Sequence, residues 1–286
     1  MRGGSGVLFN GVYLRVQPEN ISLRRFMKTL GLAPYGGDEF FIALLACGSA
    51  SFALRQVHPL LMIGPAIPFA IVVWFFRDPN RSGTTDESIL IAPADGTVTD
   101  IEELDEPDFI GGRAKRIGIF LSPFNVHVNR VPCEGTVRGS RYRAGDFLPA
   151  YNPKAPEKNE SVSLDLVTPK GLRLVVKQVT GVLARRIVCE ARPGETLARG
   201  QRYGMIKFGS RTEVYVPIGA FEASLVQLGD KVKGGQTPIC KIREVIATPA
   251  TDEARERAEL LLQGAAMIDA SAPPEAPKLS DAVRES

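Results

Sequence analysis

The sequence predicts a mainly β domain, a compact antiparallel barrel or sandwich, preceded by a hydrophobic helical hairpin. Between Ile89 and about Glu244 the chain consists of short β-prone runs separated by Gly, Pro and Asp turns. The 28 glycines and 21 prolines among 286 residues favour turns over long helices. Ahead of this region lie two long apolar runs without a charge.

Composition excludes several classes of protein. Hydrophobic residues make up 44% and charged residues 23%, which is typical of a globular chain and not of a disordered one. The net charge of +3 is too small to indicate nucleic-acid binding. The four cysteines form no CxxC pair and there are only two histidines. We therefore expect neither a disulfide framework nor a metal site.

The apolar runs are Phe40–Leu54 and Leu60–Phe76, each slightly shorter than the roughly 20 residues that cross a bilayer as a helix. Neither has the polar face of a soluble core helix, although a pair of buried core helices is the alternative. The second run ends in aromatic residues followed by Arg77, as in an interfacial belt. We expect a membrane hairpin over residues 39–77, preceded by a basic, amphipathic segment over residues 1–38.

The charges around this hairpin predict its orientation. Basic residues flank it on both sides, whereas the connecting loop has only Arg55. The positive-inside rule then places both ends and the following domain on the cytoplasmic face of the cell membrane. A cleavable signal peptide is not expected, because the first 30 residues contain no long apolar core.

A β-rich domain is predicted over residues 78–247. Its β-prone segments are RIGIFLS, GLRLVVKQV, RIVCEA, GMIKFG and TEVYVP. Its turns PADGTV, RPGETLARGQ and LGDKVKGGQT resemble those of lipoyl- and biotinyl-carrier domains. Thr251 is a suitable N-cap for a helix over residues 248–268. The Pro/Ala/Ser-rich tail, residues 269–286, is expected to be disordered.

Several polar residues are candidates for chemistry, and each also has a structural interpretation. Lys231 in GDKVKGGQT fits a solvated turn better than a modified carrier lysine. Asp95 lies in an Asp-Gly dipeptide, which is common in hairpin turns. His127 lies among apolar neighbours and is either a core residue or an acid–base group. Arg130 is a candidate anion contact.

The Gly209–Ser210 step interrupts two strongly β-prone runs, so the chain has to bend there. A strained peptide beside a hydroxyl is open to attack by the serine Oγ on the preceding carbonyl, provided that a base and an oxyanion site are near. This is a chemical possibility and does not follow from spacing alone.

Four motifs in order carry a resemblance to a known family: FFRDPNR (75–81), APADGTV (92–98), FLSPFNVHVNRVP (120–132) and IKFGSR (206–211). Together they resemble phosphatidylserine decarboxylase proenzymes of the short bacterial and archaeal type, over roughly Phe75 to Arg243. The resemblance implies that the chain cuts itself between Gly209 and Ser210. It also implies that Ser210 becomes a pyruvoyl group, and that the products 1–209 and 210–286 stay together as a heterodimer.

The resemblance further implies that Asp95 and His127 are the acid–base partners of self-cleavage. The implied reaction converts phosphatidylserine to phosphatidylethanolamine and CO2 through a Schiff base with the pyruvoyl group, which supplies the electron sink that no natural side chain provides. No Gly-rich phosphate loop supports pyridoxal phosphate. Longer members carry a second histidine where this chain has Arg130, so His127 serves both maturation and turnover or another group takes one role.

The residues alone leave two other functions possible. One is a pyruvoyl-dependent decarboxylase of a soluble amino acid, against which the apolar hairpin counts. The other is a non-enzymatic membrane adaptor with a lipoyl-like domain, which has no use for an internal Gly-Ser cut. An intact-mass measurement after expression separates these classes, because an adaptor stays at 286 residues.

Overall fold

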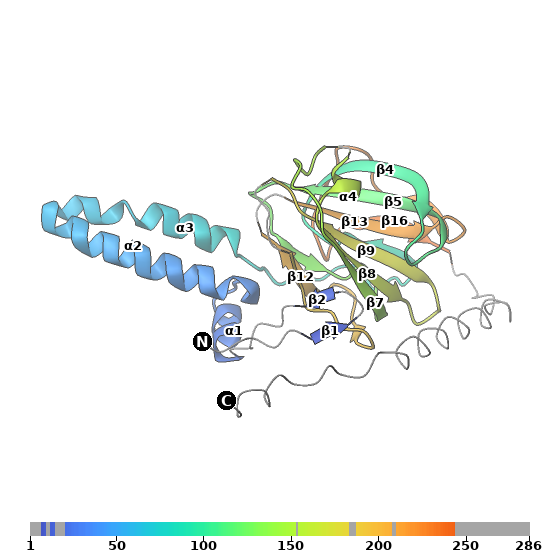
Figure 1. The fold of residues 1–286 in the computed structure, drawn as a ribbon, viewed down its shortest axis with the longest axis horizontal. Coiled ribbons are helices and arrows are strands. Elements are labelled where there is room, and N and C mark those ends of the chain that lie inside the picture. The colour runs from blue at the N-terminus through green and yellow to red at the C-terminus, as the bar shows by residue number, and fades with distance from the viewer. Residues whose placement is uncertain are drawn as a thin grey trace, which may run out of the picture. The chain divides into compact units, whose positions relative to one another are not determined.

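The structure is a computed structural model that describes residues 7–9, 12–14, 21–152, 154–182, 187–207 and 210–243 (Figure 1). Contacts divide the chain into two units, Met1–Val245 and Ile246–Ser286. The expected helix over 248–268 and the tail over 269–286 lie outside the described residues, and the predicted domain boundaries stay predictions.

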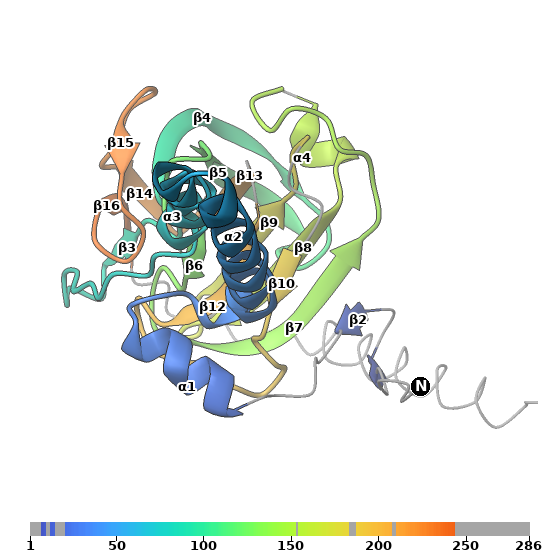
Figure 2. The ribbon, with the colours of Figure 1, turned by 90° about the vertical axis from the view of Figure 1, so that its left-hand side faces the viewer.

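Helices occupy the two apolar runs. The helical elements are α1 (Ile21–Thr29), η1 (Pro34–Gly36), α2 (Gly37–Val57), η2 (Pro59–Ile63), α3 (Ala66–Phe75) and α4 (Ala155–Lys158). α2 has acidic residues in its first turn and Arg55 in its last, which complements the helix dipole. α2 and α3 contact each other and lie side by side (Figure 2).

Only one of these helices is long and apolar enough to cross a membrane within the described part of the chain. It spans Pro34–Val57, with a mean hydropathy of 1.6 and only 6% of its most apolar window buried. The following apolar helix, Pro59–Phe75, is shorter. The membrane hairpin therefore stays a prediction, although its two helices are present.

The remainder is mainly β. The strands are β1 (Val7–Phe9), β2 (Val12–Leu14), β3 (Ile89–Ile91), β4 (Gly96–Glu106), β5 (Gly112–Leu121), β6 (Val128–Arg130), β7 (Gly135–Arg143), β8 (Ser161–Val167), β9 (Arg173–Val179), β10 (Ile187–Cys189), β11 (Thr196–Leu197), β12 (Arg202–Ile206), β13 (Ser210–Pro217), β14 (Phe221–Ser224), β15 (Lys231–Val232) and β16 (Pro238–Ile242). Each of the five β-prone segments named from the sequence overlaps one of these strands.

The largest sheet has eight antiparallel strands in the order β11-β7-β8-β9-β13-β5-β4-β15. Two three-stranded sheets, β10-β12-β6 and β14-β16-β3, accompany it. The sheet is curled, with β11 and β15 at its two ends, so the expected mainly β, antiparallel class is confirmed, and its form is a curled sheet (Figure 1). The pairings do not test the lipoyl-like character of the turns. Lys231 begins β15 and is exposed, in agreement with a solvated turn residue.

Strand β13 lies in the middle of the large sheet and is buried on both faces. Its Val214 and Val216 belong to the main hydrophobic core. On the opposite face, Arg211, Glu213 and Tyr215 are buried as well, as the alternation of side chains along a strand requires. This second face is polar, so its charges have to be paired inside the protein.

Three polar side chains surround the Arg211 guanidinium. Its Nε donates to Glu213 Oε1 at 2.6 Å, its Nη1 donates to Thr99 Oγ1 at 2.8 Å, and its Nη2 lies 2.5 Å from Asp100 Oδ2. Gly118 of β5 leaves room for this contact, because a Cβ there would lie 2.0 Å from Arg211 Nη2. Burial alone would raise the pKa of Glu213, but Arg211 and other nearby cations hold it below its usual value.

We predict that Gly118→Ala destabilises the protein by displacing Arg211 from Asp100. Breaking one contact of a buried ion pair is expected to remove about 3 kcal/mol of folding stability. The midpoint of thermal unfolding should then fall by roughly 5–10 °C. Gly139→Ala is the matched control, since a Cβ there meets nothing closer than 3.7 Å. Equal midpoints for the two variants would contradict the role given to Gly118.

Candidate active site

Ser210 is the first residue of β13 and is fully buried. Its backbone pairs with Leu121 of β5, and its Oγ makes no hydrogen bond within the described residues. Leaving a buried hydroxyl without a hydrogen-bond partner lowers folding stability by on the order of 1–3 kcal/mol. Such a group in a native structure therefore indicates a functional role. Phe208 and Gly209 lie outside the described residues, and the expected cleavage site is therefore described on its Ser210 side only.

Lys207 is the last described residue before that gap, and its side chain is buried. Its Nζ forms an ion pair with the Glu39 carboxylate in the first turn of α2. The same Nζ lies 5.8 Å from the centre of the Phe76 ring. The chain leading to Ser210 is thus attached to the base of the apolar helices.

His127 lies one residue before β6, and its imidazole is buried. Its Nδ1 lies 3.0 Å from the carbonyl oxygen of Asn125. A carbonyl only accepts hydrogen bonds, so in the neutral ring Nδ1 carries the proton and Nε2 carries the lone pair. The Phe75 ring packs against the imidazole with 4.5 Å between centroids. This packing places the imidazole in an apolar environment.

Burial controls the charge of this imidazole. It lowers the pKa of His127 to about 4, with a further lowering from Arg77 and partial opposition from the Asn125 hydrogen bond and the Asp95 charge. His127 is therefore neutral at pH 7. A neutral imidazole has one nitrogen lone pair and can act as a base.

The backbone brings His127 beside the strand that leads to Ser210. The carbonyl of His127 accepts a hydrogen bond from the amide of Ile206 at 3.3 Å, and Val128 pairs with Met205. Ile206 ends β12, four residues before Ser210. His127 thus lies beside the strand that precedes Ser210, although the two residues are distant in sequence.

A row of buried polar side chains joins β6 to β13 in the same region. Asn129 Nδ2 donates to Thr212 Oγ1 at 3.1 Å, and Gln178 Nε2 donates to Asn129 Oδ1 at 2.8 Å. Thr212 and Ser210 project from the same face of β13, because side chains alternate. Sequence reasoning missed Asn129 and Gln178. The alternation in NVHVN, which places Asn129 two residues after His127, was the available signal.

Asp95 lies in the turn between β3 and β4, and both of its carboxylate oxygens are engaged. Oδ2 accepts from Arg81 Nη2 at 2.8 Å, while Oδ1 pairs with Arg81 Nη1 and accepts from the amide of Gly234 at 2.8 Å. Asp95 is also near enough to His127 for its charge to raise the pKa of that imidazole. It therefore has a structural role and an electrostatic one.

Arg130 is 3% exposed and already engaged. Its Nη2 donates to Asp78 Oδ1 at 2.8 Å and to the carbonyl of Pro79 at 3.0 Å, and its Nη1 donates to the carbonyl of Gly200 at 3.2 Å. Its backbone amide donates to the carbonyl of Pro93 at 2.8 Å, which seats the Asp95 turn against β6. The substrate contact expected of Arg130 stays a prediction, and these contacts do not favour it.

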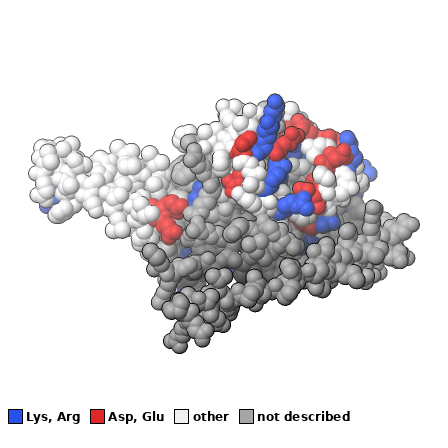
Figure 3. All heavy atoms as spheres, viewed as in Figure 1, with Lys and Arg blue, Asp and Glu red and all other residues white. Residues whose placement is uncertain are grey.

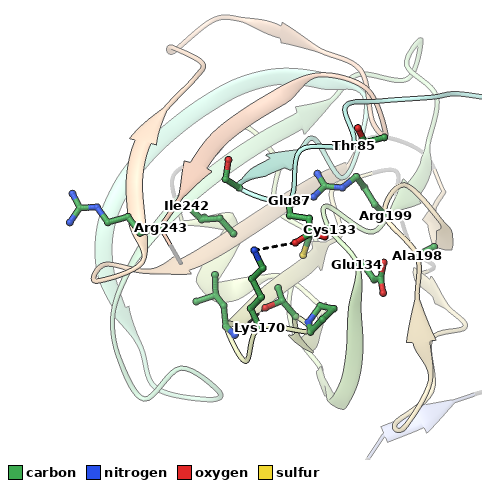
Figure 4. A pocket seen from close by; sticks show the side chains of 13 residues that line it. Thr85, Glu87, Cys133, Glu134, Lys170, Ala198, Arg199, Ile242 and Arg243 are labelled. Atoms are coloured by element: carbon green, nitrogen blue, oxygen red, sulfur yellow. Dashed lines mark hydrogen bonds and ion pairs between the residues drawn. The ribbon is translucent and has the colours of Figure 1, made fainter. Parts of the chain in front are cut away.

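A separate cavity of about 480 Å³ opens among side chains from several loops (Figure 4). Its lining includes Cys133, Arg199 and Arg243, and Lys170 Nζ lies across it at 3.1 Å from Glu87 Oε2. None of the expected site residues lines this cavity. In the described part of the chain, no three His, Cys, Asp or Glu side chains gather as they would around a metal ion.

Comparison with known proteins covers the region of the four motifs. A sequence model of the family described as phosphatidylserine decarboxylase matches residues 69–240. A "phosphatidylserine decarboxylase proenzyme" of Carboxydothermus hydrogenoformans is 49% identical over 205 residues, which are 72% of this chain and 95% of the relative. Proteins of the same name from Symbiobacterium thermophilum and Salinibacter ruber are 47% and 42% identical, covering 72% and 70% of this chain and 94% of each relative.

The lowered pKa of His127 predicts a direct NMR observation. In a His58→Gln protein, the single remaining imidazole should titrate near pH 4 in the folded state and near its ordinary 6.5 when unfolded. Because the unfolded chain then takes up the proton first, His127 lowers folding stability as the pH falls from 6.5 to 4. A folded-state titration at or above pH 6.5 would show that the ring is not held neutral by burial.

Proposed function

Because the chain belongs to the phosphatidylserine decarboxylase family, we propose that it decarboxylates phosphatidylserine with a pyruvoyl group made from its own Ser210. It is an enzyme that is synthesised as a proenzyme and processed by its own chemistry. The observation that carries the proposal is the buried Oγ of Ser210 at the start of β13, which has no hydrogen-bond partner among the described residues and lies in the region where a neutral histidine is held.

Ser210 suits the role of pyruvoyl precursor. Its Oγ has no competing hydrogen bond among the described residues, and attack on the carbonyl carbon of Gly209 would break the peptide C–N bond and form an ester. Loss of the Ser210 Cα proton then expels the Gly209 carboxylate. Hydrolysis of the resulting dehydroalanine releases ammonia and leaves the pyruvoyl group. When formed, that group supplies an electron sink for the carbanion left by CO2.

His127 is the proposed base. Its Nε2 takes the hydroxyl proton of Ser210 and returns it to the amine that leaves. The Nδ1 hydrogen bond to the Asn125 carbonyl holds the ring in the tautomer that this requires. Asp95 acts through its charge, which favours the transient imidazolium. We propose that the same imidazole serves the product step, where the carbanion is reprotonated.

The two products, 1–209 and 210–286, should remain one particle. β13 pairs with β5 along all eight of its residues and with β9 along five. A cut immediately before Ser210 breaks one covalent bond and none of these ladder pairs. The new chain end is therefore held in the middle of a sheet.

We propose that α2 and α3 attach the enzyme to the cytoplasmic face of the membrane. Their surface carries almost no charge, as Figure 3 shows, and charged groups gather where the helices meet the strands. Exposed side chains along them include Leu45, Phe52 and Ile67. Monomeric soluble proteins rarely expose so large an apolar surface, and a lipid substrate accounts for it.

Ser210→Ala tests the precursor role. Without a nucleophile at this position the chain should stay at 286 residues and show no decarboxylase activity, while its thermal midpoint stays near that of the native protein. Ser210→Thr keeps a hydroxyl and should be cut slowly, leaving a ketobutyryl group. Denaturing electrophoresis and CO2 release measure both outcomes. An uncut Ser210→Ala protein with full activity would exclude the pyruvoyl mechanism.

A pair of variants separates the two roles of Asp95. Asp95→Asn and Arg81→Met break the same buried ion pair, but only the first removes the carboxylate. If the carboxylate assists His127, Asp95→Asn should slow self-cleavage by about 100-fold or more, and Arg81→Met by much less. The rate of conversion of pulse-labelled precursor measures both. Equal rates of self-cleavage in the two variants would show that Asp95 has only a structural role.

A further inference from the structure

The loop between β5 and β6 presents one apolar ring to the outside on a rigid turn. Phe124 is 78% exposed, more than any other aromatic side chain in the described ranges. The turn beneath it is fixed by Asn125, whose Oδ1 accepts from the amide of Ser122 at 2.9 Å and from its hydroxyl at 2.8 Å. Holding a phenyl ring in water is unfavourable, so a rigid loop of this kind indicates a surface that covers it.

Arg77 joins this loop to the end of α3. Its Nη2 donates to the carbonyl of Phe124 at 2.6 Å, and its Nη1 donates to the carbonyl of Trp74 at 2.7 Å. The guanidinium also lies 4.1 Å from the centre of the Trp74 ring, which is 57% exposed. Arg77 thus stacks on one exposed ring and is bonded to the backbone of the residue that carries the other, and aromatic residues with a basic neighbour are the composition found at a membrane–water interface.

The same three residues border the candidate active site. Phe75, which follows Trp74, packs against the His127 ring at 4.5 Å. Asn125, which follows Phe124, accepts the hydrogen bond from His127 Nδ1. Each exposed ring is therefore one residue away from a direct contact of the imidazole. A surface that covers Trp74 and Phe124 therefore lies close to the residues that contact His127.

We infer that Trp74, Arg77 and Phe124 form an interfacial rim that rests on an anionic phospholipid bilayer. The two rings lie at the headgroup–acyl boundary and Arg77 faces the lipid phosphates. A bilayer is the occupant that fits, because the rim continues the exposed apolar surface of α2 and α3 and adds a cation that contacts the Trp74 ring and the Phe124 backbone. The inference rests on the proposed phospholipid substrate and adds the surface through which its headgroup reaches His127.

The single tryptophan of the chain makes the rim directly observable. Three single-tryptophan proteins are compared: the native enzyme with Trp74, a Trp74→Phe/Phe124→Trp variant, and a Trp74→Phe/Leu228→Trp control. Leu228 is 66% exposed in the loop between β14 and β15 and serves as the matched position away from the rim. Vesicles of phosphatidylserine and phosphatidylcholine, with and without bromine on the acyl chains, are the probe.

Fluorescence from positions 74 and 124 should shift to shorter wavelength on vesicles and be quenched roughly twofold or more by the brominated lipid, whereas position 228 should not change. Quenching at 74 without quenching at 124 would overturn the rim and leave attachment to the helices alone. A vesicle-independent shift at 124 that grows with protein concentration would overturn it in favour of a second copy of the chain. None of these readouts depends on decarboxylation, so the proposed function is tested separately.

A kinetic comparison tests the consequence for the substrate. Phe124→Ser should raise the KM for phosphatidylserine in vesicles by about tenfold, because the headgroup is presented less well to the site. Self-cleavage and the rate on dispersed short-chain phosphatidylserine should match those of Leu228→Ser. Equal losses on vesicles and on dispersed substrate would show that Phe124 acts inside the site and not at the bilayer.

Discussion

The pairing of β13 with β5 and β9 is the interaction on which the proposed chemistry depends. A protein that cuts its own backbone has to keep the new chain end where it was. The proposed new end is the first residue of a central strand, and its neighbour Arg211 is held by Glu213, Asp100 and Thr99 inside the protein. The ladder and the ion pairs are both independent of the bond that is cut. We therefore expect a cut before Ser210 to leave the architecture unchanged.

Burial sets the chemical state of His127 and Ser210 in the same region. It keeps the His127 imidazole neutral at pH 7, and it leaves the Ser210 hydroxyl without a partner among the described residues. Both features are unfavourable for stability, and both suit an internal nucleophile and its base. The ion pairs of Asp78 with Arg130 and of Asp95 with Arg81 fix the loops that surround them.

The sequence allowed the β-rich class, the two apolar helices and the family to be predicted, because each depends on local patterns or on motifs in order. It did not allow the closure of the sheet to be predicted, since an open curl and a barrel use the same short strands. Arg130 was expected to contact an anion. Its burial against Asp78 depends on a segment 52 residues earlier, which no local pattern connects to it. Gln178 was missed for the same reason, because it contacts Asn129 from 49 residues away.

The central claim is that the chain matures by converting Ser210 into a pyruvoyl group. The most direct test is the intact mass of the purified native protein under denaturing conditions, combined with reaction of its smaller chain with hydrazine. We expect chains of residues 1–209 and 210–286 that co-elute before denaturation, with the smaller one blocked to Edman degradation and reactive toward hydrazine. A smaller chain that begins with a free serine amine, or an active protein that is still a single chain, would contradict it.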